Sequence, residues 1–117
     1  MKTVRGRLKN LLNAVANREY IERLQMVIHQ LDGCDSIHVE SVPVNEVFRG
    51  KTVWQGEVEV FGLAGHPKAK RCYAWSHREG KRDVGERFVA VLEIPPVISA
   101  ETAVKASIVA DSKSKSK

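Results

Sequence analysis

The chain has 117 residues, of which 43% are hydrophobic and 28% charged, and its formal net charge is +5. This length suits one domain with its own hydrophobic core, and the composition is that of a soluble globular protein rather than a fibrous or disordered one. Seven of the 19 basic residues lie within the first nine or the last five positions, and the remainder holds 12 basic and 14 acidic residues. Because the body of the chain is not basic, the charge argues against an extended phosphate-binding surface.

The two cysteines indicate a reducing compartment. Cys34 and Cys72 are too few for a disulfide framework and form no Cys-x-x-Cys motif, so we expect free thiols in the cytoplasm. No apolar run approaches the ~20 residues of a membrane helix. The first twenty residues lack the unbroken apolar centre and the cleavage site of a signal peptide. We therefore predict a cytoplasmic protein with no membrane partner.

Residues 3–32 have the apolar spacing of helices. The spacing forms two stripes that do not join smoothly, and Asn17 between them is a good N-cap. We therefore predict a basic, partly helical N-terminal segment over 1–17 and a firmer helix over about 18–32, which ends at Gly33. The two stripes consist of Val4, Leu8, Leu11, Leu12 and Val15, and of Ile21, Leu24, Val27, Ile28 and Leu31.

The next block, residues 36–94, alternates like β-strands. Its connections of about 5–9 residues suit an antiparallel meander, because a parallel crossover needs a dozen or more. Pro43 places its strand at a sheet edge, since proline cannot donate to a ladder. The last strand is apolar on both faces, which predicts burial on both sides. The expected strands are 37–44, 52–61, 69–77 and 87–94.

Pro95 and Pro96 end the last strand, and Ser99 is a good cap for a final helix. That helix has a narrow stripe of small residues that suits packing against a sheet. Residues 112–117, SKSKSK, predict a disordered tail, which leaves one domain over 18–111. The predicted fold class is α+β: a four-stranded antiparallel meander sheet with the N-terminal and C-terminal helices packed on one face.

Two runs of the sequence resemble a group of small uncharacterised bacterial proteins. The shared features are a Trp-x-Gly-x-Val-Glu-Val-Phe strand, a Gly-His-Pro turn, a Tyr-Ala-Trp strand and an Ile-Pro-Pro segment before a final helix. The resemblance covers about residues 53–109 and implies a bacterial, cytoplasmic, one-domain protein. It carries no activity to this chain. The two runs are VWQGEVEVFGLAGHPKAKRCYAWSH and RFVAVLEIPPVISAETAVKASIV.

The segment GHPKAKRCYAWSH gathers most of the chemically interesting side chains. Cys72 and His77 are five residues apart on a strand, so they point to opposite faces and cannot form a thiol–imidazole pair. No His or Cys pair has a strong metal-ligand spacing. Gly65-His66-Pro67 is typical of a turn. We therefore predict no catalytic residue, no metal and no cofactor, and we do not expect an enzyme.

On the same segment, Tyr73 and Trp75 share one face of the strand. We predict that this face is left open by the helices and also carries Glu57 and Glu59. Aromatic residues are enriched in interfaces, so we expect a non-enzymatic interaction module that self-associates through its sheet as a homodimer. The candidate surface comprises His66, Arg71, Tyr73, Trp75, His77 and Arg78.

Two alternatives remain open from the sequence. An aromatic strand flanked by basic residues could stack the bases of a single-stranded nucleic acid, with the basic ends of the chain adding weak affinity. A small-molecule or enzyme site could also lie in a dimer cleft near His66 and His77. The identity of any protein partner cannot be read from these residues.

Overall fold

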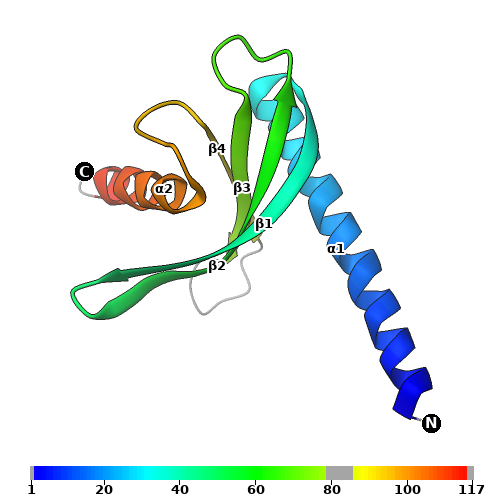
Figure 1. Ribbon diagram of the computed structural model, residues 1–117. Helices are drawn as coiled ribbons and strands as arrows, with labels where there is room; N and C mark the ends of the chain where they lie inside the picture. The colour runs from blue at the N-terminus through cyan, green and yellow to red at the C-terminus, as the bar shows by residue number, and fades with distance from the viewer. Residues whose placement is uncertain (1, 79–85, 116–117) are drawn as a thin grey trace.

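The computed structural model describes residues 2–78 and 86–115, and the side chains of residues 17–76 and 87–110. Within them the chain forms one four-stranded antiparallel sheet in the order β1-β2-β3-β4, preceded by one helix and followed by another (Figure 1). This confirms the α+β class and the meander. The elements are α1 (Lys2–Asp32), β1 (Asp35–Phe48), β2 (Lys51–Ala64), β3 (Arg71–Arg78), β4 (Glu86–Leu92) and α2 (Ala100–Lys115).

The two helices cover opposite faces of the sheet, so the prediction that both pack on one face is wrong (Figure 1). The middle strands are apolar on both faces, and each face needs its own cover. Under α1 the buried cluster consists of Leu24, Ile28, Phe61, Cys72 and Ala74. Under α2 it consists of Val44, Val58, Val60, Tyr73, Trp75, Val97, Ala100, Ala103 and Val104.

Both helices are longer than the sequence pattern indicates. The first helix runs through Asn17 without the predicted break, and its first half continues past the sheet (Figure 1). It ends where Gly33 adopts a φ of +68° and donates its N–H to the carbonyl of His29 at 2.9 Å, the left-handed termination expected of glycine. The final helix continues to Lys115, inside the segment predicted as a tail, and residues 116–117 lie outside the described chain.

β1 and β2 form a hairpin that reaches far beyond the rest of the sheet. A two-residue turn joins them, Arg49-Gly50, with φ values of +52° and +78°, the left-handed pair that a tight type I′ hairpin requires. β3 pairs with only four residues of β2, from Glu59 to Gly62. The outer part of the hairpin, residues 42–58, is called the arm here. It curves beneath α2 (Figure 1), which packs against its inner face.

Candidate functional site

The aromatic residues that the sequence placed on an open surface are part of the hydrophobic core. Tyr73 is 3% and Trp75 is 2% exposed, both beneath α2. The Trp75 ring meets Trp54 of the arm edge-on, with centroids 5.8 Å apart and planes at 63°. Gly56 makes room for this pair, because a Cβ there would lie 3.1 Å from the Trp54 ring. The prediction of an outward aromatic face is therefore wrong.

The Tyr73 hydroxyl is held by an acidic partner. It donates a hydrogen bond to the carboxylate of Glu93, just after β4. Burial, and then the hydrogen bond and charge of Glu93, raise the pKa of Tyr73 to about 12. The phenol therefore stays protonated at neutral pH and acts as a donor to Glu93, so it is not available as a base.

His66 organises the loop between β2 and β3. Its Nδ1 accepts hydrogen bonds from the backbone N–H groups of Lys68 at 3.0 Å and Ala69 at 2.9 Å. Because Nδ1 is the acceptor, the ring proton of the neutral imidazole lies on Nε2. Gly65 precedes it with a φ of +83°. This geometry supports the turn interpretation of Gly65-His66-Pro67.

The remaining candidates of the predicted surface do not gather around these residues. Arg71 is exposed at the start of β3. His77 and Arg78 belong to β3, but their side chains lie outside the described residues. Since Tyr73 and Trp75 are buried, the predicted surface is not one continuous patch.

Cys72 is fully buried beneath α1, and burial raises the pKa of its thiol to about 12. The thiolate is the nucleophilic form of cysteine, so this thiol is inert at neutral pH. Cys34 is also buried, and both thiols are free. The structural interpretation of Cys72 agrees with this environment.

The sequence did not reveal a polar trio on the α1 face of the sheet. Glu59, predicted to face outward, is only 2% exposed. One of its carboxylate oxygens, Oε1, lies 2.9 Å from His38 Nε2 and also accepts a hydrogen bond from the Ser41 hydroxyl. The His38 ring packs on Phe61, with centroids 5.4 Å apart.

A β-bulge brings this trio together. Residues three apart on a regular strand point to opposite faces, yet His38 and Ser41 both meet Glu59. The ladder of β1 and β2 shifts between His38 and Glu40, and the extra residue, Val39, turns Ser41 to the face of His38. The His38 ring and the Ser41 hydroxyl therefore both bind the Glu59 carboxylate, and neither binds the other. In a catalytic triad the imidazole lies between the hydroxyl and the acid, so this trio anchors the bulge rather than activating a nucleophile.

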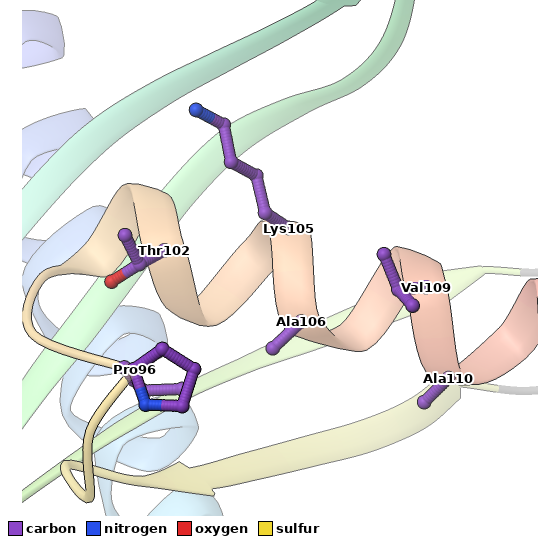
Figure 2. Close-up of a pocket in the computed structure, with 7 residues that line it drawn as sticks. Pro96, Thr102, Lys105, Ala106, Val109 and Ala110 are labelled. Carbon is purple, nitrogen blue, oxygen red and sulfur yellow. The ribbon is translucent and has the colours of Figure 1, made fainter.

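Large apolar side chains remain exposed at several places outside the two clusters. Three are at the tip of the arm, where Phe48 is 62% exposed beside Val47 and Val53. Three others are Ile94, Ile98 and Val109, before and along α2. A shallow groove of about 500 Å³ runs along α2 beside the segment that precedes it (Figure 2), and it is lined by Pro96, Val97, Thr102, Lys105, Ala106, Val109 and Ala110.

Neither a metal centre nor a membrane-spanning helix is found in the part of the chain that the structure describes. Among the described side chains, residues 17–76 and 87–110, no three His, Cys, Asp or Glu lie close enough together to hold a metal ion. Neither described helix is long and apolar enough to cross a membrane. Comparison with family models, with curated proteins and with solved structures finds no match to the chain.

Proposed function

We propose that this protein is a non-enzymatic interaction module that associates with a second copy of itself. The observation that supports it is a set of large apolar side chains left exposed just after β4 and along α2, where Ile94 is 38%, Ile98 69% and Val109 52% exposed. Contiguous exposed apolar patches on a small domain commonly mark contacts with other proteins.

The state of the reactive groups supports the non-enzymatic part of the proposal. The Tyr73 hydroxyl is bound to Glu93, His66 Nδ1 is bound to two backbone amides, and Cys72 is a buried thiol. Each of these three groups is therefore already engaged by, or buried within, its own chain. The alternative of a ligand site in a dimer cleft near His66 and His77 depends in part on His77, whose side chain lies outside the described residues.

The nucleic-acid alternative loses the residues on which it depended. Base stacking needs an accessible aromatic face. Tyr73 and Trp75 are covered by α2, so neither ring can receive a base. What is left of that hypothesis is the positive charge at the two ends of the chain, which gives only salt-sensitive binding without sequence preference.

The tip of the arm supports a second candidate, the binding of a different protein. Phe48 and Val47 are exposed at the turn, and the Arg49 guanidinium lies 5.2 Å from the centroid of the Phe48 ring. The arm is held against α2, and Lys105 of that helix lies 4.0 Å from a carboxylate oxygen of Glu46. Because α2 already restricts the motion of the arm, its apolar tip can bind a partner with little loss of conformational entropy.

Sedimentation velocity of the purified protein over a wide concentration range tests the main proposal. We expect a species of twice the monomer mass that persists at high salt, since apolar contacts are not screened. An elongated monomer at every concentration would contradict the proposal. A Phe48→Ser variant tests the second candidate: it should leave the self-association intact and remove a heterologous partner that co-purifies with the wild type.

A further inference from the structure

We infer that the contact between the two copies is the outer edge of β4, which pairs antiparallel with β4 of the second copy and extends the sheet to eight strands. This inference rests on the self-association proposed above. The contact uses the backbone groups of β4 that face away from β3, and the two copies meet in one particular register.

β4 has the sequence of a central strand but lies at the edge of the sheet. Residues 88–92, Phe-Val-Ala-Val-Leu, contain no polar side chain. Apolar runs of this kind are typical of strands that are covered on both faces and flanked by neighbours on both sides. In the described chain β4 has β3 on one side only, and all five residues are half-buried.

Both hydrophobic clusters end at β4, whose apolar side chains are only partly buried. Phe88, Ala90 and Leu92 pack at the margin of the cluster beneath α1. Val89 and Val91 pack at the margin of the cluster beneath α2. A second β4 alongside would continue both cores across the contact, so one strand pairing covers apolar surface on two faces at once.

The hydrogen-bonding pattern shows which backbone groups of β4 face outward. The N–H of Glu93 donates to the carbonyl of Arg71 at 2.9 Å, so Glu93 points its backbone groups toward β3. Since direction alternates along a strand, Val89 and Val91 also point toward β3, whereas Phe88, Ala90 and Leu92 point outward. The Leu92 carbonyl additionally accepts from the N–H of Ile94 at 2.9 Å, where the strand ends.

The opposite edge of the sheet is protected against such pairing. β1 contains Pro43, which has no N–H to offer, and its ladder is irregular at two places. It also carries Asp35, Glu40 and Glu46. Proline, bulges and charges are the devices that keep an edge strand from pairing with another chain, and β4 has none of them between residues 88 and 92.

The sequence of β4 fits an antiparallel copy of itself centred on Ala90. In that register Ala90 faces the partner's Ala90, and Phe88 faces the partner's Leu92, so all outward backbone groups meet outward groups. Arg87 then lies opposite the partner's Glu93, and the two-fold axis repeats this proximity of opposite charges at the other end, in addition to the contacts that both residues make within their own chain. A register centred on Val89 would lack this charge complementarity, because it sets Arg87 against the partner's Val91.

Amide hydrogen exchange of the wild type tests the pairing without any substitution. The amides of Val89 and Val91 should be protected in every state, because they bond to β3. The amides of Phe88, Ala90 and Leu92 should be protected at concentrations where the protein is dimeric and exchange rapidly after dilution to the monomer. Rapid exchange of these three amides in a demonstrated dimer would overturn the inference and leave the self-association standing. A protein that is monomeric throughout would overturn both.

Proline at position 90 gives an independent test. The Ala90 N–H points outward, so Ala90→Pro removes no bond to β3. By two-fold symmetry it removes two bonds between the copies, and the dissociation constant of the dimer should rise at least about tenfold. The matched control is Phe48→Ser at the arm tip, which should not change that constant. An unchanged dimer in Ala90→Pro, or dissociation caused by Phe48→Ser instead, would overturn the β4 contact. If Ala90→Pro does not fold, the exchange pattern of the wild type decides.

Discussion

Replacement of Trp75 by alanine tests the central feature of the fold, the cover that α2 gives to the β3 aromatics. The side chain is 2% exposed and contacts Trp54 edge-on. Truncation of a buried tryptophan costs about 3–5 kcal/mol, and loss of the ring pair places this site toward the upper end. Domains of this kind have about 5–15 kcal/mol of stability in total. Trp75→Ala should therefore remove a large part of it and lower the melting temperature by roughly 15 °C.

Urea unfolding followed by far-UV circular dichroism measures this loss. Both proteins should be at the same concentration, because self-association adds to apparent stability. The matched control is Met26→Ala on the outer face of α1, where the side chain is 63% exposed and the change should stay within about 0.5 kcal/mol. A loss below about 1.5 kcal/mol for Trp75→Ala would mean that α2 does not cover β3 and would refute the packing argument.

Three further outcomes follow from the environments of single groups. The Tyr73 pKa is raised from 10.0 to about 12, so the stability that its protonated form gives is complete below pH 10 and is lost as pH rises toward 12. Tyr73→Phe should therefore flatten the alkaline decline, measured by urea unfolding, by up to about 1.4 kcal/mol per pH unit. Cys72 should resist alkylation in the folded protein and react only on unfolding, as mass spectrometry of its peptide can show; rapid modification of the native state would contradict its burial. His66→Ala should cost about 1 kcal/mol in thermal melts, because two backbone N–H groups of the loop lose their acceptor, and His66→Asn should recover part of it.

Alternation within each strand could be predicted from the sequence, whereas the register between strands could not. The pattern correctly separated Val58 and Val60 from Glu57 and Glu59 on β2, and Cys72 from Tyr73 on β3. It contains no information on which face of β2 continues as which face of β3. The structure pairs Val60 with Tyr73 and Glu59 with Ala74, the reverse of the predicted grouping. That pairing places the β3 aromatics on the face of Val58 and Val60, where they are buried beneath α2.

The length of the β1–β2 hairpin could not be predicted from the sequence, for a different reason. The sequence predicts a connection between strands 37–44 and 52–61, and residues 46–51 contain no Asn-Gly or Asp-Gly pair, the strongest signal of a two-residue turn. Arg49 nevertheless adopts a φ of +52°, a conformation that non-glycine residues take seldom and at some cost. Packing of Val44 and Trp54 against α2 extends the strands to the turn and offsets that cost. Such tertiary support is not visible in local sequence.

The buried trio shows what an unexpected polar residue contributes to a hairpin of this length. Apolar pairs such as Val42 with Val58 would tolerate a slip of β1 along β2, because another valine is always near. A slip would separate Glu59 from His38 and Ser41, and a buried carboxylate without donors costs several kcal/mol. The carboxylate therefore discriminates among registers more strongly than the valines do. By fixing the bulge at Val39 it also fixes where the arm leaves the sheet, and this links a buried polar contact to the direction of the arm tip.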